Sequence, residues 1–363
     1  MRILLVNKYY HPRIGGVETV VTNIAEEFVR RGHQVTVLCM DPEIEEEVVI
    51  NGVQVVRLRR DLPFLAGLNR KAWKWMKRNA SAFDVVHLHN YHMLLTFQCA
   101  YLLRTERKKY VLTMYYHGRG HTFLRNILFR SYHLLGQRVL DWSERIATGS
   151  EHELSLVKRD FRQSKEKYVI IPYGSREFPD LKMERVKGRM LYVGRLMPYK
   201  NVDKCIDLLA LLRQGKVEAS LHIVGKGPDA ERLRAHAEAQ GVAERVTFLE
   251  DVKDDKMAAE YQSASLLILL SSAESYGLVL AEALTQGTPC LVAKAAALTE
   301  FTQETGCYGV TYPLEMDELM RLAARLLDPS EKIQVGPFSD RMLSWPQVAQ
   351  RYLNIYNEAV DST

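Results

Sequence analysis

Two glutamates on either side of a short turn carry the clearest chemical signal in this sequence. Glu274 precedes the turn, and Glu282 follows it in a segment whose apolar residues recur with helical spacing from Leu278 onward. A helix that begins there presents unpaired backbone N–H groups, those of Tyr276, Gly277 and Leu278, and such a terminus binds phosphate. Carboxylates beside an anion site can accept hydrogen bonds from hydroxyl groups attached to the anion. The stretch therefore indicates a sugar nucleotide, although simple pairing of carboxylates with the helix dipole remains the alternative.

Two cations and two glycines form further candidate sites at the ends of expected strands. Arg195 and Lys200 follow an expected strand at 190–193 in a single loop. Doubly wound sheets bind ligands at the carboxyl ends of their strands, and two cations there suit a leaving diphosphate. A solvated basic loop is the alternative. Gly15 and Gly16 stand between the first strand and the first helix, where glycine either admits a ligand to the backbone or merely turns the chain.

Short apolar runs alternate with amphipathic segments along the whole chain, which predicts parallel sheets covered by helices. Strands are expected at 3–7, 33–40, 84–89, 110–115, 145–150, 168–172, 190–193, 221–224, 246–249, 266–270 and 290–293. With 363 residues the chain is long enough for two domains. A connection at about 173–188, rich in Pro, Gly and charge, places the boundary near residue 175.

Several strings resemble one enzyme family, and together they cover nearly the whole chain. Glu274 and Glu282, with seven residues between them that include Gly277, resemble the E-x7-E signature of retaining glycosyltransferases of the GT4 family. YYHPRIGGVE, DVVHLH and GRLMPYKN match further motifs, with Asn201 in place of the family's Gly in the last. The resemblance implies the GT-B fold, in which two Rossmann-like doubly wound α/β domains face each other across a cleft. Residues 1–175 would form the acceptor-side domain and 176–344 the nucleotide-sugar-binding domain, with a C-terminal helix within 345–363 crossing back to the first.

The resemblance also implies which residues hold the donor. Glu274 would bind sugar hydroxyls and Glu282 the ribose. The donor diphosphate would meet the remaining group, formed by Gly15, Gly16, Arg195, Lys200, Ser275, Tyr276, Gly277 and Leu278. The loops at Gly225 and at Asp251 and Val252 look like the edge where backbone groups of the family read the nucleobase.

The expected chemistry is metal-independent transfer with retention at the anomeric carbon. No two Asp residues are separated by a single residue, so the D-x-D metal clasp of other transferases is missing, and no cofactor is expected. His117 matches the family's histidine over the donor sugar, although Gly118 stands where the family often has Asp. His117 and Glu274 are therefore the predicted catalytic residues. His87 and His89 share one side of a strand, but a third metal ligand is missing, so packing is expected there.

Composition points to a cytoplasmic protein that could associate peripherally with the inner face of the membrane. Five scattered Cys without a C-x-x-C motif indicate reduced thiols, and neither a signal peptide nor a membrane span is expected. Residues 1–175 hold 27 Lys/Arg against 17 Asp/Glu, whereas the rest hold 22 against 27. The basic, aromatic-containing stretches 59–78 and 119–138 suit either an anionic membrane surface or a solvated helix face. No nucleic-acid-binding motif is present.

The predicted function is a glycosyltransferase that moves a sugar from a nucleotide-diphosphate donor, with a UDP-sugar favoured, to a glycan, glycolipid or secondary-metabolite acceptor. Three other functions remain open at this point. The chain could be a sugar-nucleotide hydrolase or epimerase on the same fold, or a non-catalytic sugar-nucleotide-binding protein. A Rossmann oxidoreductase is disfavoured, because no expected strand is followed by G-x-G-x-x-G.

Overall fold

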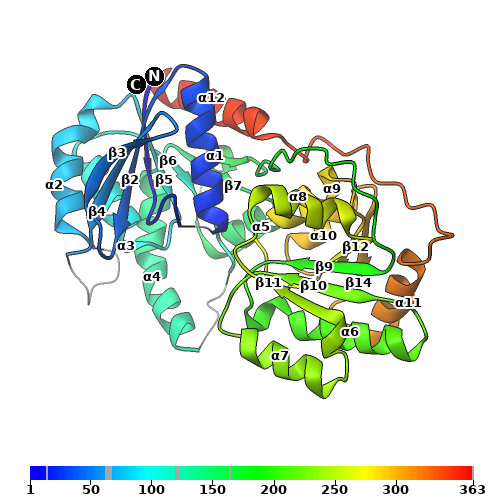
Figure 1. Cartoon of the computed structure of the whole chain (residues 1–363). Coiled ribbons are helices and arrows are strands. Elements are labelled where there is room, and N and C mark those ends of the chain that lie inside the picture. Colours follow the sequence, from blue (N-terminus) through cyan, green and yellow to red (C-terminus); the bar gives the residue numbers. More distant parts are fainter. Residues whose placement is uncertain (14, 62–67, 119–122, 163–164, 362–363) are drawn as a thin grey trace. The chain divides into compact units, whose positions relative to one another are not determined.

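The computed structural model describes residues 1–13, 15–61, 68–118, 123–162 and 165–361. The chain forms two compact units, one of Met1–Gly174 with Leu343–Thr363 and one of Ser175–Met342, each around its own sheet (Figure 1). The divisions expected from the sequence fall after residues 175 and 344, whereas these units divide after residues 174 and 342. Both units are α/β with helices on both faces of a largely parallel sheet, which confirms the expected fold class.

The described residues of the first unit form an eight-stranded sheet of order β3-β4-β2-β1-β5-β6-β7-β8. Its strands are β1 (Arg2–Val6), β2 (Gln34–Asp41), β3 (Glu46–Ile50), β4 (Val53–Arg59), β5 (Val85–His89), β6 (Val111–Thr113), β7 (Arg145–Thr148) and β8 (Tyr168–Ile170). All neighbours are parallel except β3 and β4, which form an antiparallel hairpin at the edge. Neither strand of the hairpin was predicted; β3 is largely exposed and lacks a long apolar run, whereas β4 is mostly buried.

Among the described residues of the first unit, six α-helices pack around this sheet. They are α1 (Gly16–Arg30), α2 (Arg70–Asn79), α3 (Leu94–Thr105), α4 (Phe123–Trp142), α5 (Glu151–Asp160) and α12 (Trp345–Asp361). The C-terminal helix α12 lies beside α1 (Figure 1), where the rings of Tyr356 and Phe28 are 5.5 Å apart. The chain therefore returns to the first unit, as expected.

The second unit has a wholly parallel sheet of order β11-β10-β9-β12-β13-β14. Its strands are β9 (Arg189–Val193), β10 (Ser220–Val224), β11 (Val246–Leu249), β12 (Leu266–Leu269), β13 (Cys290–Ala293) and β14 (Cys307–Val310). On one face lie α6 (Val202–Gln214), α7 (Ala230–Ala239) and α11 (Met316–Leu326), and on the other α8 (Asp254–Ser263), α9 (Leu278–Thr285) and α10 (Leu298–Phe301) (Figure 1). The central strands β12 and β13 are buried at every position, which explains their uninterrupted apolar sequence.

The two histidines of β5 lie in the interior of the first unit. His87 and His89 are both fully buried. The ring nitrogens of His87 lie 2.6 Å from the Tyr356 hydroxyl and 2.8 Å from the Thr113 hydroxyl, and Nδ1 of His89 lies 3.1 Å from the Tyr115 hydroxyl. Burial lowers the pKa of His89 to about 3. The pair is thus part of the packing between the sheet and α12.

Candidate functional site

The second unit brings most of the predicted donor-binding residues to one edge of its sheet. Strands β11, β10, β9 and β12 are neighbours and parallel, so their carboxyl ends meet at the same edge. The loops that follow them carry, in that order, Asp251 and Val252; Gly225; Arg195 and Lys200; and Glu274 to Leu278. Residues far apart in sequence are therefore assembled by strand order alone.

The loops after β9 and β12 are tied together directly. The ammonium group of Lys200 is paired with the Glu274 carboxylate, and the two side chains are only 12% and 16% exposed. Asn201 Nδ2 donates to the Leu270 carbonyl at 2.8 Å, and the Ser272 N–H donates to the Tyr199 carbonyl at 2.9 Å. The ion pair is thus held in place by contacts on both sides of it. Sequence reasoning gave Lys200 and Glu274 separate roles, and the structure joins them.

Arg195 differs from Lys200 in having an exposed side chain. Within the described part of the chain, its guanidinium makes no hydrogen bond and no ion pair. Its backbone is nevertheless fixed, because the hydroxyl of the buried Tyr192 donates to the Arg195 carbonyl at 3.0 Å. Burial, and then the charge of Glu274, raise the pKa of Tyr192. The Arg195 guanidinium therefore faces the solvent, while the Arg195 backbone is held by Tyr192.

The turn before α9 places backbone N–H groups at the start of the helix. Gly277 caps the helix with φ 122°, a conformation that side chains rarely adopt. Among the described residues, the N–H groups of Gly277 and Leu278 have no hydrogen-bond partner. The Tyr276 side chain lies inside the unit instead, with its ring centroid 5.2 Å from that of Phe301 and its hydroxyl 3.3 Å from the Arg341 carbonyl. Only the backbone of Tyr276 is therefore suited to a ligand.

Glu282 lies one turn into α9 and is 9% exposed. Its Oε2 accepts a hydrogen bond of 2.8 Å from the hydroxyl of Tyr261 on α8. Burial, and then the Glu282 charge, raise the pKa of Tyr261. Tyr261 thus orients the carboxylate that is expected to meet the donor ribose. Sequence reasoning missed Tyr261, because it belongs to α8 and to no motif.

The loops after β10 and β11 are shaped by close backbone packing. A Cβ atom at Gly225, whose φ is 145°, would lie 1.9 Å from the Gly194 carbonyl oxygen. The Gly225 N–H in turn donates to the Leu249 carbonyl at 2.9 Å. Asp251 has φ 51° and an 80% exposed side chain paired with Lys226. These positions can offer backbone groups to a nucleobase, while the Asp251 carboxylate is directed to solvent.

The other predicted residues belong to the first unit. Gly15 caps α1 and Gly16 begins it, after β1, whereas His117 is exposed and follows β6. Burial lowers the pKa of His92 to about 4, with further lowering by His117 and by Lys8. Since Lys8 follows β1 and His92 follows β5, both lie with His117 at the carboxyl edge of this sheet.

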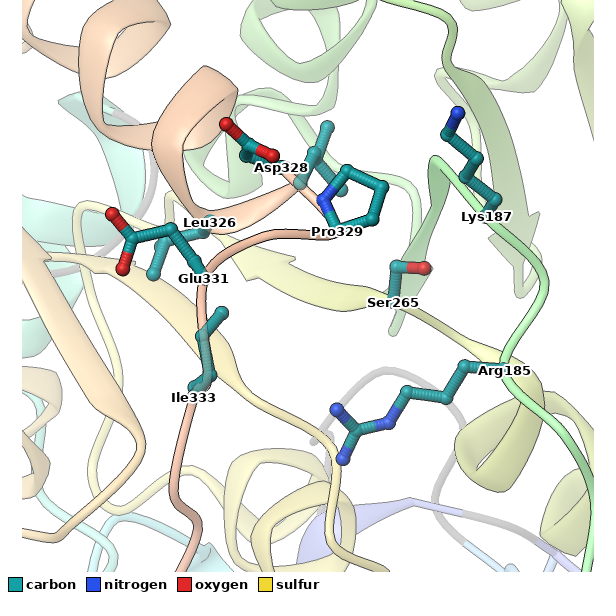
Figure 2. A pocket seen from close by; sticks show the side chains of 9 residues that line it. Arg185, Lys187, Ser265, Leu326, Asp328, Pro329, Glu331 and Ile333 are labelled. Carbon is teal, nitrogen blue, oxygen red and sulfur yellow. The ribbon is translucent and has the colours of Figure 1, made fainter.

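A pocket of about 290 Å³ in the second unit lies elsewhere (Figure 2). Ser265 directly precedes β12, and Arg185 and Lys187 precede β9, so the pocket is at the amino edge of the sheet. Asp328 and Glu331 line its other side. None of the predicted site residues lines it. Among the described residues, no group of three or more His, Cys, Asp or Glu could hold a metal ion.

Two family models match the chain over adjoining ranges. Residues 14–175 match the model described as Glycosyltransferase Family 4, and residues 176–334 match that described as Glycosyl transferases group 1. Together with the two parallel-sheet units, these matches place the chain in a class: it is a GT-B glycosyltransferase of the GT4 type.

Particular relatives span most or all of the chain. It is 26% identical over 389 residues to an uncharacterized glycosyltransferase of Methanocaldococcus jannaschii, covering 99% of each chain. It is 26% identical over 335 residues to a GDP-mannose-dependent alpha-(1-6)-phosphatidylinositol dimannoside mannosyltransferase of Mycobacterium tuberculosis, covering 84% of this chain and 83% of the relative. The structure of Anabaena HepE in complex with UDP and glucose has the same fold, with a TM-score of 0.73 at 18% identity over 98% and 99% of the two chains.

Proposed function

We propose that this glycosyltransferase moves a sugar, with retention of anomeric configuration, from a nucleotide-diphosphate donor to a glycan, glycolipid or secondary-metabolite acceptor, and that a UDP-sugar is its donor. The observation that carries the proposal is the cluster at the carboxyl edge of the second sheet. It combines the Lys200–Glu274 pair, the solvent-facing cation of Arg195 and the N–H groups of Gly277 and Leu278, for which the described part of the chain offers no partner. The UDP and glucose of Anabaena HepE support the choice of nucleotide.

The cluster supplies positive potential where a leaving diphosphate needs it. A helix N-terminus and two cations stabilise negative charge as it develops on the departing phosphate, so the step needs no divalent cation in this proposal. Glu274, held by Lys200, would accept hydrogen bonds from the donor sugar, and Glu282, held by Tyr261, from the ribose.

Retention follows in this proposal from attack on the face that the leaving group departs from. The departing phosphate would take the acceptor's proton, so no side chain acts as a dedicated base. His117 would position the sugar and the acceptor and stabilise the oxocarbenium-like charge. Two carboxylates flanking the anomeric carbon would be the glycosidase route. In this proposal neither carboxylate takes that role, since Glu274 is paired with Lys200 and Glu282 accepts a hydrogen bond from Tyr261.

A donor panel with and without acceptor tests the proposal. Thermal shifts with UDP-, GDP- and ADP-sugars should select a UDP-sugar, and NMR of the product should show the anomeric configuration of the donor. A preference for GDP-mannose, the donor named for the mycobacterial relative, would correct the nucleotide only. Donor consumption without transfer to any acceptor would favour a hydrolase or epimerase, and binding without turnover a sugar-nucleotide-binding protein.

The acceptor side of the proposal includes peripheral binding to an anionic membrane at its cytoplasmic face. On α2, Lys74, Lys77 and Arg78 are exposed and have no ion-pair partner among the described residues. Trp73 stacks on the 47% exposed Tyr101 beside them, with ring centroids 6.2 Å apart. Cations around partly exposed aromatic rings suit the membrane interface. The phosphatidylinositol dimannoside acceptor named for the mycobacterial relative supports a lipid-linked substrate.

Only part of the two basic stretches lies among the described residues. Residues 62–67, and the side chains of 119–131, lie outside the described residues. No described helix has the length and apolar character to cross a membrane. Each of the three α2 cations contributes roughly 1 kcal/mol near an anionic surface, so replacing all three by Ala should weaken sedimentation with phosphatidylglycerol vesicles about 100-fold. The matched control is Lys204→Ala in the second unit, and equal binding by the two variants would refute the surface.

A further inference from the structure

The segment that carries His117 has a backbone that the surrounding fold must hold in place. Tyr115 has φ 54°, in the left-handed region that residues other than glycine rarely adopt. Gly118 follows with φ 73°. Such a backbone conformation persists only where neighbouring groups fix it. Residues in such conformations are often found at functional sites. The position of His117 therefore depends on what binds residues 115–118.

One buried carboxylate on α5 ties this segment to the next strand. Glu153 is fully buried, and its Oε1 accepts a hydrogen bond of 2.6 Å from the Tyr116 N–H. Its Oε2 accepts one of 2.7 Å from the Gly149 N–H, directly after β7. The same helix is capped by the Ser150 hydroxyl, which accepts from the Glu153 N–H at 3.1 Å. Glu153 thus joins the ends of β6 and β7.

Further contacts fix the residues on either side of His117. The Tyr116 hydroxyl donates to Asp160 Oδ2 at 2.6 Å, at the far end of α5. The Tyr115 hydroxyl lies 3.1 Å from His89 Nδ1. At Gly118 a Cβ atom would lie 3.3 Å from Leu156 Cδ1, so the segment runs close along α5. This contact, together with the positive φ, explains why Gly stands where the family often has Asp.

We propose that Glu153 is a positioning residue for sugar transfer, because it holds the backbone that presents His117. The inference rests on the proposed role of His117. A buried carboxylate is costly unless hydrogen bonds satisfy it, and an apolar side chain of similar size would serve packing equally well. What the carboxylate adds is geometry, since two acceptor oxygens fix two backbone N–H groups of neighbouring loops at once.

Glu153→Gln tests the inference, because it keeps the volume and turns one acceptor oxygen into an NH₂ donor that faces an N–H. We expect kcat to fall at least tenfold. The donor Kd should change less than twofold, since the donor-binding cluster belongs to the second unit. The matched control is Glu151→Gln, which removes an exposed carboxylate from the first turn of the same helix and should keep wild-type kcat.

A double-mutant cycle with His117→Ala separates positioning from general destabilisation. If Glu153 acts through His117, Glu153→Gln lowers kcat no further in the His117→Ala background. Equal fold losses in both backgrounds, or wild-type kcat in Glu153→Gln, would overturn the inference.

Wild-type turnover of His117→Ala alone would instead contradict the proposed role of His117. In that case, the chemical shift of the His117 ring in ¹³C-histidine NMR reports whether Glu153 still fixes the segment that carries His117. A resonance that moves in Glu153→Gln but not in Glu151→Gln supports the inference, and one that stays in place overturns it.

Discussion

Replacing Lys200 by Ala separates transition-state stabilisation from ground-state binding. The Lys200 ammonium is paired in a partly buried setting with Glu274, which precedes Gly277 by three residues. In the proposed step, the diphosphate gains negative charge as it departs, so the cation matters most in the transition state. Removing one preorganised donor of this kind costs about 2.7–4 kcal/mol, or about 100- to 1000-fold in kcat. The donor diphosphate is already charged in the ground state, so we expect its Kd to rise by about tenfold, or about 1.4 kcal/mol.

The same substitution leaves Glu274 without its cation. Breaking an exposed ion pair costs up to about 1 kcal/mol and breaking a buried one about 3–5 kcal/mol, and this pair lies between those limits. We therefore expect about 2 kcal/mol less stability in urea unfolding. Initial rates at saturating donor give kcat, and calorimetry gives Kd. Lys204→Ala is the control, since it breaks the Lys204–Asp207 pair of α6 in the same unit and should leave kcat unchanged. A Kd that rises as much as kcat falls, or a kcat within threefold of wild type, would refute the reasoning.

Three further predictions concern single residues. Gly225→Ala should destabilise the protein by more than about 3 kcal/mol. Residue 225 has φ 145°, and a Cβ atom there would lie 1.9 Å from the Gly194 carbonyl oxygen. Wild-type stability in urea would contradict this packing. Glu282→Gln should weaken donor binding about 10- to 100-fold by calorimetry, since hydrogen bonds to a charged group contribute about 1.5–3 kcal/mol, whereas the buried control Glu304→Gln should not. The pKa of His89 is about 3 when folded against 6.5, so the unfolded state binds the proton first and stability falls as pH drops below 6.5. Replacing His89 by Asn should reduce the loss between pH 6.5 and 4.5 by about 2 kcal/mol, and an unchanged loss would contradict the assignment.

The elements that flank the site could be predicted from local sequence. The uninterrupted apolar run of β12 and the glycine before α9 sufficed, because buried parallel strands and positive φ leave local signatures. Strand β3 left no such signature, since it lies exposed at the sheet edge.

Pairings between distant residues could not be predicted in this way. Lys200 and Glu274 are 74 positions apart and meet only because β9 and β12 are neighbours. Tyr261 reaches Glu282 from a different helix, with no motif around it. Local pattern and the resemblance to the family therefore identified the candidate side chains, while strand order decided which of them pair with each other.

The most direct test of the donor-site assignment is a calorimetric titration of UDP into three proteins: wild type, Arg195→Ala and Lys187→Ala. Arg195 belongs to the cluster at the carboxyl edge of the second sheet, and Lys187 lines the pocket at its amino edge (Figure 2). We predict binding at least tenfold weaker in Arg195→Ala and unchanged in Lys187→Ala. Unchanged binding in Arg195→Ala, with weakened binding in Lys187→Ala, would place the nucleotide at the other edge of the sheet and contradict the account.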